Sequence, residues 1–468
     1  MWSDLLILMK AELILAVIIF ILLFVKVAGR EGSNPSILSL VNFLLLLNLL
    51  AGFFFQEEGI LFDGMFHSTK LIILEKNVLN LGILLISLLA HGWLRGHRHV
   101  IEFYILLLSS LMGMFFTISS GNLLMFYLGF ELSTIPLAAL VNFDLQKRRS
   151  SEAAMKLIIS SAFSSGLLLF GISLVYGTTG SLQFDLIAPS LDGSALQVFA
   201  FILVLAGLAF KVSAVPFHFW TADVYEGAPV AITAYLSVVS KGAFFFVLSS
   251  VLYTLFKPIA AIWYQVIIVL SVLTMIVGNL FALRQTNLKR LLAFSSIAQA
   301  GFIMVGISGN STAGTASVIY FILVYIFSNL GAFAVIAFIS SRTGKEHLTD
   351  YKGLYKTNPF LSWVLAISVF SLAGIPPTAG FFGKFFLLIA GAAQGNYVLI
   401  TIAALNMVLS LYYYLVIIKA IFMDANVNPV EPVKVDLFPR TAMIICLAGI
   451  IFSGITSWVF NYIFILSN

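Results

Sequence analysis

Five charged side chains lie inside strongly apolar segments of this sequence: Glu131, Lys156, Lys211, Lys241 and Lys384. If these segments cross a bilayer, each charge at the centre costs about 2.5–3.5 kcal/mol, and all five roughly 12–17 kcal/mol. That sum is comparable with the net stability of a whole domain, about 5–15 kcal/mol. Burial lowers the pKa of a lysine, so that it can exchange protons near neutral pH. We therefore interpret the five residues as candidates for proton translocation.

Two structural alternatives stay open for these charges. They could form buried ion pairs, or their long side chains could reach the membrane interface. The second alternative applies most directly to Lys156, which lies only a few residues into its apolar segment. Pairing explains the four lysines less well, because Glu131 is the one acid found beside them.

Hydroxyl and amide groups accompany these charges, and we expect some of them to form a hydrated proton path. The candidate relay residues are Ser237, Ser295, Ser296 and Gln299, with further polar residues at Ser160, Ser161, Ser164, Ser165, Ser240, Ser328 and Asn329. Hydrogen bonds between membrane helices would explain the same residues. His218 could relay protons at neutral pH, or could cap backbone groups beside a helix break.

The composition indicates that membrane-spanning helices hold these residues. The chain has 468 residues, of which 61% are hydrophobic and 10% charged, and its mean hydropathy is +1.07. Soluble domains carry about 25% charged residues, so a water-soluble enzyme is excluded. Apolar runs of about 20 residues, long enough to cross a bilayer as helices, recur along the chain. The sequence predicts an all-α polytopic membrane protein.

The apolar runs predict about fourteen transmembrane helices. Their expected ranges are 4–27, 37–55, 71–94, 101–119, 121–141, 153–176, 196–226, 228–252, 259–282, 289–307, 315–340, 359–392, 397–422 and 441–464.

The seventh and twelfth helices should be broken inside the membrane. Pro216 interrupts the seventh near Ser213–Pro216, and Pro376 and Pro377 interrupt the twelfth near Gly374–Pro377. Proline removes a backbone donor and clashes with the preceding turn. Each break lies close to a lysine, Lys211 or Lys384.

These two broken helices run in opposite directions, which is typical of inverted repeats with an ion path at their interface. We therefore predict one membrane domain, 1–468, with two inverted five-helix repeats at 101–252 and 259–422. Residues 1–100 supply the first three helices, and 441–464 the last.

The basic residues predict the orientation. Seventeen of the 25 Lys and Arg residues fall in loops or helix ends after odd-numbered helices, and two in those after even-numbered helices. The positive-inside rule then places Gly32 and Arg149 in the cytoplasm, and Asp192, Asn468 and both termini outside. The first apolar run shows no small-residue cleavage site, so we expect a retained helix rather than a signal peptide.

Several kinds of site are missing from the sequence. One cysteine, Cys446, permits no internal disulfide, zinc cluster or iron–sulfur site. The chain shows no Walker loop, no glycine-rich dinucleotide motif and no CxxC pair. Because these motifs are missing, we expect no cofactor on this chain. We also expect no nucleic-acid partner, because the basic bias of cytoplasmic loops explains the net charge of +5.

Three long motifs resemble those of the antiporter-like membrane subunits of complex I, the proton-pumping NADH:quinone oxidoreductase. They are KVSAVPFHFWTADVYEGAP at 211–229, LKRLLAFSSIAQAGF at 288–302 and SLAGIPPTAGFFGKFFL at 371–387. The likeness covers nearly the whole chain. Three features resemble the N branch of this family, which includes mitochondrial subunit 2. They are the WTADVYEGAP segment, a lysine at position 384 where the M branch has glutamate, and the absence of a lateral helix.

This resemblance implies roles for individual residues. Glu131 corresponds to the acid that pairs with the helix-seven lysine, Lys211, and tunes its proton affinity. Lys241 corresponds to the central lysine, Lys384 to the lysine toward the periplasmic exit, and Lys156 to a helix-six lysine. The family often has tyrosine where this chain has Phe294.

The resemblance also implies the surroundings of the chain. NADH, FMN, iron–sulfur clusters and quinone would be bound by partner subunits. The expected neighbours are lipid, the antiporter-like subunit M and small membrane subunits, in the plasma membrane of a bacterium.

Three functions stay open from the sequence. The first is a proton-translocating subunit of a redox-driven complex. The second is a subunit of an Mrp-type cation/proton antiporter or of a membrane-bound hydrogenase-like complex. The third is a structural membrane subunit whose charges only hold the bundle together.

Overall fold

The computed structural model describes residues 2–28, 34–54, 56–426 and 428–468, and within them the chain is almost entirely helical. The basic residue Arg30 and the predicted cytoplasmic marker Gly32 lie outside the described residues. By length and composition, 11 of the described helices are suited to cross a membrane. The chain is a multi-pass membrane protein. It divides into two compact units, described here one at a time.

The first unit comprises residues 1–84, 93–212 and 240–265. Its helices are α1 (Trp2–Leu8), α2 (Lys10–Val27), α3 (Asn34–Phe54), α4 (Lys70–Leu94), α5 (Val100–Ile118), α6 (Leu123–Val141), α7 (Arg148–Thr179), α8 (Phe184–Ile187), α9 (Ala195–Lys211) and α12 (Lys241–Tyr253), with short 3-10 turns at Ala188–Ser190 and Lys257–Ile259.

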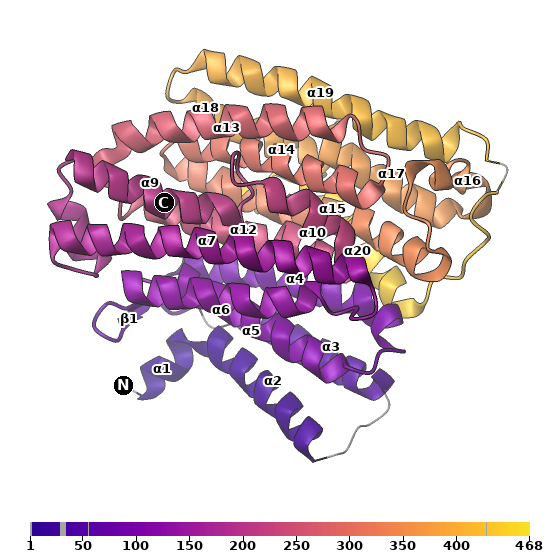
Figure 1. Cartoon of the computed structure of the whole chain (residues 1–468), viewed down its shortest axis with the longest axis horizontal. Helices are drawn as coiled ribbons and strands as arrows, with labels where there is room; N and C mark the ends of the chain where they lie inside the picture. Colours follow the sequence, from indigo (N-terminus) through magenta and orange to yellow (C-terminus); the bar gives the residue numbers. More distant parts are fainter. Residues whose placement is uncertain (1, 29–33, 55, 427) are drawn as a thin grey trace. The chain divides into compact units, whose positions relative to one another are not determined.

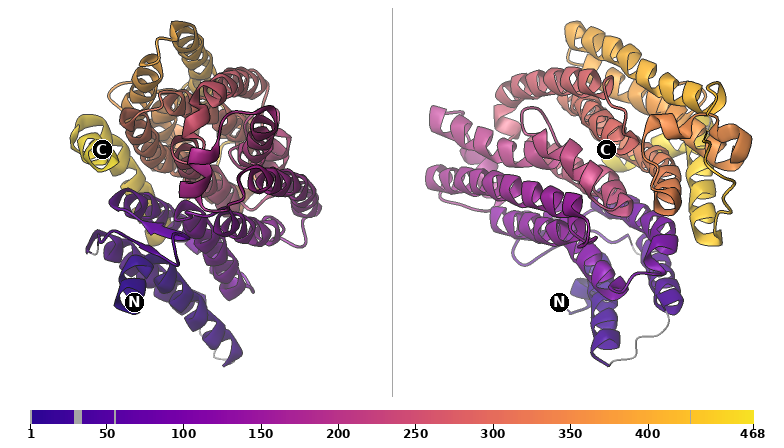
Figure 2. Two further views of the ribbon diagram at one scale, coloured as in Figure 1. Left: turned by 90° about the vertical axis from the view of Figure 1, so that its left-hand side faces the viewer. Right: turned by 45° about the vertical axis from the view of Figure 1, so that its right-hand side comes forward.

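Two helix pairs form the centre of this unit. α5 packs along α6, and α7 along α9. α6, α7 and α9 lie side by side in Figures 1 and 2. Gly113 allows the close approach of α5 to α6, because a Cβ atom there would lie 2.3 Å from the main-chain nitrogen of Ser133. Small residues at such crossings let helix backbones come close together in membranes.

A short hairpin departs from the predicted all-helical architecture. β1 (Gly59–Leu61) pairs antiparallel with β2 (Phe66–Ser68) in the first unit (Figure 1). Asp63 and Gly64 have positive φ values of 52° and 89° between the strands. Asp-Gly is a common hairpin-turn pair, and it lies here in the turn that joins the two strands.

The second unit comprises residues 85–92, 213–239 and 266–468. Its helices are α10 (Phe219–Gly227), α11 (Val230–Tyr235), α14 (Leu288–Ser308), α15 (Thr312–Thr343), α16 (Leu354–Thr357), α17 (Pro359–Ala373), α18 (Ala379–Ala392), α19 (Tyr397–Phe422), α20 (Leu437–Ile455) and α21 (Trp458–Ser467), with a 3-10 turn at Leu348–Tyr351. α4, α13 (Ala260–Ala282) and a π segment, Leu236–Ser240, each extend across both residue sets.

α15 is the central helix of this second unit. It packs against α14, α17, α18, α20 and α21, and most of its residues are buried. α14 is buried over its whole apolar stretch. The core of this unit therefore forms around two helices that face other helices on almost every side.

Both predicted helix breaks are confirmed. The seventh predicted helix ends as α9 at Lys211 and resumes as α10 at Phe219, and the twelfth ends as α17 at Ala373 and resumes as α18 at Ala379. The Val215–Pro216 and Pro376–Pro377 peptide bonds are cis. Two further interruptions were not predicted, between α1 and α2 and between α20 and α21, where no proline marks the break.

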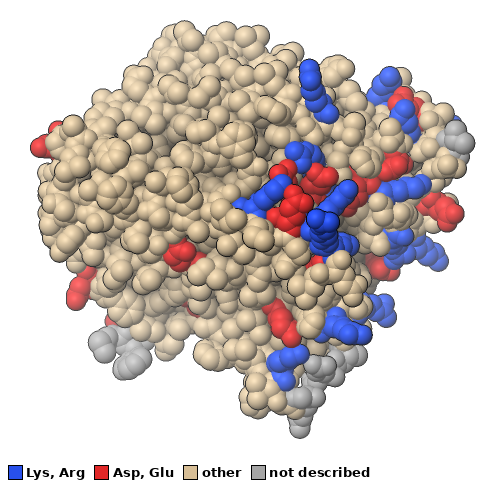
Figure 3. Space-filling view, viewed as in Figure 1, with Lys and Arg blue, Asp and Glu red and all other residues tan. Residues whose placement is uncertain are grey.

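Apolar side chains cover much of the exterior. Phe20, Leu128 and Phe163 are 70%, 59% and 67% exposed, and Figure 3 shows large areas of the visible surface without Lys, Arg, Asp or Glu. Such surface is suited to lipid or to other apolar helices rather than to water.

Candidate functional site

Lys211 is the last residue of α9 and lies directly before the helix break. Its side chain is buried, with 5% exposure. The Nζ atom donates hydrogen bonds to Ser133 Oγ at 3.1 Å and to Thr134 Oγ1. It also lies over the rings of Phe130 and Phe244, at 4.5 and 4.6 Å from their centroids. The ammonium group is thus held by two hydroxyls and two aromatic faces.

Glu131 is on α6, one turn from these hydroxyls, and is only partly buried. It accepts a hydrogen bond from Ser165 on α7, and Ser165 Oγ lies 3.1 Å from Tyr127 Oη. In the part of the chain that the structure describes, Glu131 forms no direct ion pair with Lys211, although the two charges interact electrostatically. The two residues of the expected pair are each bound to hydroxyl groups instead.

Lys241 is the first residue of α12 and follows the π segment Leu236–Ser240. It is buried, with 3% exposure. α12 packs against α5 and α9. Single π turns inside α-helices are frequent at functional sites, because they shift the side chains that follow.

Lys156 differs from the other lysines. Its side chain is 42% exposed and forms an ion pair of 2.8 Å with Glu152, one turn earlier in α7. Lys156 therefore lies at the surface of its unit and not inside it, which fits the alternative of a side chain that reaches outward better than that of a buried ion pair.

The break after α9 is organised by polar contacts in the second unit. Ser213 has a positive φ of 60° and accepts a hydrogen bond of 2.7 Å from Thr221. The backbone nitrogen of Val215, before Pro216, donates to Thr274 Oγ1 at 3.0 Å. His218 is buried beside Phe219. Its side chain makes no capping hydrogen bond at the start of α10.

Lys384 is the most buried of these lysines, with 1% exposure. Its Nζ atom donates to the main-chain oxygens of Leu372 and Ala373 at 2.8 and 3.3 Å. These oxygens belong to the C-terminal turn of α17, where the helix leaves carbonyls without intrahelical partners. Such carbonyls carry partial negative charge and stabilise a cation. The break at Pro376–Pro377 therefore leaves these two carbonyl oxygens free to accept hydrogen bonds from Lys384.

The predicted relay residues Ser295 and Gln299 join the same network. Gln299 Nε2 donates to the Leu372 oxygen at 3.1 Å and to Tyr414 Oη at 3.2 Å. Tyr414 Oη lies 2.5 Å from Ser295 Oγ. A polar connection therefore runs from Lys384 through Leu372 and Gln299 to Tyr414 and Ser295.

The other predicted relay residues, and the polar residues near them, form hydrogen bonds both within their own helices and to other helices. Ser237 donates to the Ala234 oxygen at 3.1 Å and to Asn329 Oδ1 at 3.3 Å. Ser296 donates to the Ala293 oxygen in its own helix at 2.7 Å. Ser328 and Ser371 are hydrogen bonded at 2.7 Å, and Ser371 Oγ also accepts from the Gly380 nitrogen across the break.

Sequence reasoning missed Tyr414, which supplies a buried hydroxyl from α19 to Ser295 and Gln299. It also missed ion pairs near helix ends. Lys289 forms an ion pair of 2.9 Å with Glu346, and Arg290 binds Asp223 and Glu226 at 2.7 and 2.9 Å. The VYEG motif contributes Glu226 to this last contact, a pairing that spacing along the chain does not indicate.

Two acids in the first unit were also overlooked. Glu12 and Glu75 are buried, with 2% and 5% exposure, so Glu131 is not the only acid in the apolar helices. Across residues 2–28, 34–54, 56–426 and 428–468, no group of His, Cys, Asp or Glu side chains is suited to hold a metal ion.

Comparisons with known proteins relate this chain to one family. Residues 120–410 match the family described as NADH:quinone oxidoreductase/Mrp antiporter, TM. NADH-quinone oxidoreductase subunit N of Phocaeicola vulgatus is 46% identical over 461 residues, which cover 97% of each chain.

Solved structures agree with this relationship. A chain of respiratory complex I from Thermus thermophilus with bound aureothin is 28% identical, with a TM-score of 0.81 over 95% of this chain and 96% of that one. A chain of the Mrp complex from Dietzia sp. DQ12-45-1b shares the fold, with 21% identity and a TM-score of 0.86 over 98% and 96% of the two chains. The matched motifs and the curated relative together show that this chain belongs to the NADH:quinone oxidoreductase/Mrp antiporter family, in its NADH-quinone oxidoreductase subunit N branch.

Proposed function

We propose that this chain translocates protons as the antiporter-like subunit N of a NADH:quinone oxidoreductase complex. Quinone reduction in other subunits would drive proton transfer along buried lysine and glutamate residues of this one. The observation that carries the proposal is the burial of Lys211 and Lys384 against neutral oxygen atoms rather than carboxylates.

The surroundings of Lys211 support reversible protonation. A hydroxyl can accept a hydrogen bond from an ammonium group and can donate one to a neutral amine. Ser133 and Thr134 can therefore satisfy Lys211 in both protonation states without moving another charge. A carboxylate partner would instead favour the charged state alone.

Lys384 is supported in a different way. The carbonyls of Leu372 and Ala373 accept hydrogen bonds from both the ammonium and the neutral amine, and the end of α17 favours the ammonium. Gln299 and Tyr414 then extend the network by groups that can reorient. This side-chain chemistry fits a proton carrier better than a fixed structural charge.

Within this proposal, Glu131 tunes Lys211 and Lys241 acts as the central carrier. Ser237, Ser295, Ser296, Gln299 and His218 are relay residues, and the breaks at Pro216, Pro376 and Pro377 allow local movement. Lys156, which is partly exposed and paired with Glu152, would exchange protons at the surface of its unit.

The proposal also covers the assembly. NADH, FMN, iron–sulfur clusters and quinone would lie in partner subunits, and this chain would bind none of them. Subunit M and small membrane subunits would be its neighbours. The chain would lie in a bacterial plasma membrane with both termini on the periplasmic side, as two inverted repeats at 101–252 and 259–422 following residues 1–100 and preceding 441–464.

Replacement of the lysines tests the proposal. In purified complex reconstituted into vesicles, Lys211→Ala or Lys241→Ala should sharply lower proton pumping per NADH oxidised, while native gels still show assembled complex. Lys257→Ala, at an exposed 3-10 turn, is the matched control and should pump normally. Normal pumping by both buried-lysine variants would refute the carrier role.

The likeness in fold to the Mrp complex favours one second candidate, a cation/proton antiporter. That function predicts proton movement driven by a sodium gradient without NADH. It also predicts neighbouring genes for small antiporter subunits, whereas the first function predicts genes for flavin, iron–sulfur and quinone-site subunits.

A further inference from the structure

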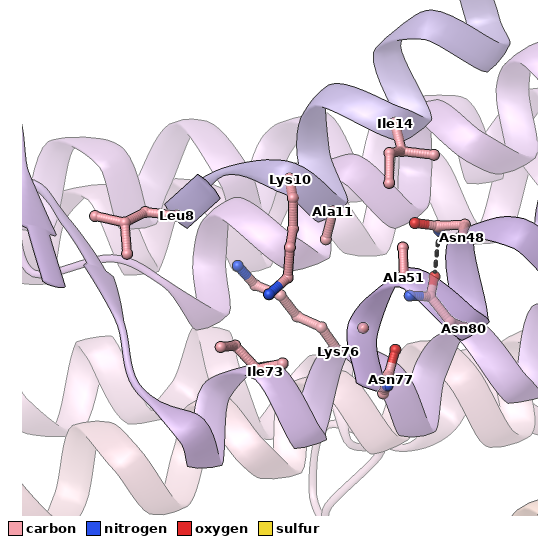
Figure 4. Close-up of a pocket in the computed structure, with 11 residues that line it drawn as sticks. Leu8, Lys10, Ala11, Ile14, Asn48, Ala51, Ile73, Lys76, Asn77 and Asn80 are labelled. Carbon is pink, nitrogen blue, oxygen red and sulfur yellow. Dashed lines mark hydrogen bonds between the residues drawn. The ribbon is translucent and has the colours of Figure 1, made fainter. Parts of the chain in front are cut away.

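A small cavity, lined by both polar and apolar residues, lies between α2, α3 and α4 of the first unit, outside the family-matched residues 120–410. Its volume is about 10 Å³, close to the minimum needed for a single water molecule. Figure 4 shows the side chains that surround it. The polar ones are Lys10, Asn48, Lys76, Asn77 and Asn80.

A buried ion pair adjoins this cavity. Lys76 Nζ donates to Glu12 Oε1 at 2.5 Å, and the two side chains are 4% and 2% exposed. The rings of Phe66 and Phe115 lie 4.9 and 5.8 Å from the same nitrogen. The other carboxylate oxygen, Glu12 Oε2, is buried and accepts no hydrogen bond from the described residues. A carboxylate left in this state is stabilised when it gains a proton or a water molecule.

Lys10 brings a second ammonium group to the cavity. In Figure 4 the side chains of Lys10 and Lys76 extend toward one another from α2 and α4. Lys10 interacts electrostatically with Lys76, with Glu12 and with Glu57, which is exposed beyond the end of α3. These charges therefore form a series from the surface to the buried pair.

Asn77 completes the lining. It is 5% exposed, and no hydrogen bond links its amide to any described residue, whereas Asn48 donates to Asn80 at 2.9 Å. Gly52 makes room for Asn77, because a Cβ atom there would lie 2.0 Å from Asn77 Oδ1. A buried amide without a protein partner is satisfied by water.

We propose that this cavity binds a water molecule and that Glu12, Lys76 and this water form a second proton-exchange site, reached from Glu57 through Lys10. The Lys76 ammonium passes one proton along its hydrogen bond to Glu12 Oε1, which leaves a neutral amine and a neutral carboxyl. The amine then takes a proton from the Lys10 ammonium through the water, and Lys10 is reprotonated from the solvent beside Glu57. Reversal of these steps returns the Glu12 proton to the Lys76 amine and one proton from Lys10 to the solvent, so that the site takes up and releases one proton in each exchange.

Fixed anchoring of α2 to α4 explains these observations less well. An ion pair that only joins two helices needs no adjoining cavity, no asparagine side chain facing that cavity and no second lysine. Apolar residues would serve that role at least as well, because burying a charged pair costs as much as its attraction returns. Transfer of the proton within the pair removes both buried charges at once. Glu75, which precedes Lys76 on α4 and is also buried, is a further titratable group that interacts electrostatically with Lys76.

Infrared difference spectroscopy of the purified complex tests the exchange directly. Upon turnover with NADH, the wild type should show a carboxyl C=O band that shifts in D₂O, and this band should be lost in Glu12→Gln. Lys10→Met and Asn77→Leu leave the ion pair in place and should shift the band. An identical band in Glu12→Gln, or no shift in both milder variants, overturns the proposal. These milder variants also supply the readout if Glu12→Gln does not assemble.

Proton yield in vesicles links the site to transport, and this part of the inference rests on the proposed function. Glu12→Gln should lower the protons pumped per NADH. Glu102→Gln should not, since Glu102 pairs with Lys26 at 3.1 Å in a half-exposed position. If Lys211→Met loses pumping while Glu12→Gln keeps the wild-type yield, this inference alone fails. If both keep the wild-type yield, the proposed function fails as well.

Discussion

The Nζ atom of Lys384 lies 2.8 Å from the main-chain oxygen of Leu372, in the last turn of α17. The lysine and its acceptor come from the two halves of one broken helix. The break therefore exposes the carbonyl end of α17 and places a buried cation against it. Without the interruption, the Leu372 oxygen would accept an ordinary intrahelical hydrogen bond and would not be free for Lys384.

Lys384→Met should remove most proton pumping, because methionine fills similar space without a group that carries a proton. The measurement is acidification of vesicles that contain the reconstituted complex, relative to NADH oxidised. Lys419→Met is the control in the same unit, because Lys419 is 64% exposed at the end of α19. Equal yields in the two variants would contradict a role for Lys384 in transport.

Tyr414→Phe should lower both stability and pumping. It removes a hydroxyl that serves Ser295 and Gln299, and leaving such buried groups unsatisfied costs about 1–3 kcal/mol. Tyr320→Phe is the matched control, because Tyr320 is equally buried but donates to the main-chain oxygen of Ser453 instead. We expect thermal unfolding of the complex to shift similarly in both variants and pumping to fall only in Tyr414→Phe.

Glu131→Gln should lose most pumping, whereas Glu131→Asp should keep part of it. Glutamine can still accept the hydrogen bond from Ser165 but lacks the charge that acts on Lys211. Moving a unit-charge pair from about 4 to about 8 Å at an effective dielectric near 20 changes the attraction by roughly 2 kcal/mol. That is close to the ~2.3 kcal/mol required per charge against 100 mV. A wild-type rate in Glu131→Gln would mean that the acid is structural.

Single-cysteine labelling should find position 149 on the cytoplasmic side and positions 192 and 468 outside. Cys446, the only native cysteine, must first be replaced so that the introduced cysteine alone is labelled. The expectation follows from the positive-inside rule. Labelling of position 468 from the cytoplasm alone would mean that the number of crossings is odd.

Gly380→Ala should destabilise the chain by about 1–3 kcal/mol, the usual cost of overpacking. A Cβ atom at this position would lie 1.7 Å from the main-chain oxygen of Ser371, across the break. Gly177→Ala in α7 meets no atom within 4 Å and should leave thermal unfolding unchanged. The comparison separates close packing at the break from the general effect of replacing a helical glycine.

The local sequence determined the apolar helices and the two breaks at their prolines. Hydropathy over about 20 residues and the positions of Pro216, Pro376 and Pro377 are properties of neighbouring residues, and the structure confirms these breaks. The burial of Lys211, Lys241 and Lys384 also follows from position, because they lie in segments too apolar to face water.

The tertiary structure alone decided which groups meet these lysines. Gln299 reaches Leu372 across 73 residues, and Ser295 reaches Tyr414 across 119. Such contacts depend on how the helices are rotated and packed against one another. The spacing of apolar residues along a single helix does not specify this packing. The same packing leaves Lys156 partly exposed beside Glu152 and buries Glu12 with Lys76. Helix formation depends on residues that are neighbours in the sequence. The group that contacts a buried charge depends instead on the packing of helices that lie far apart in the sequence.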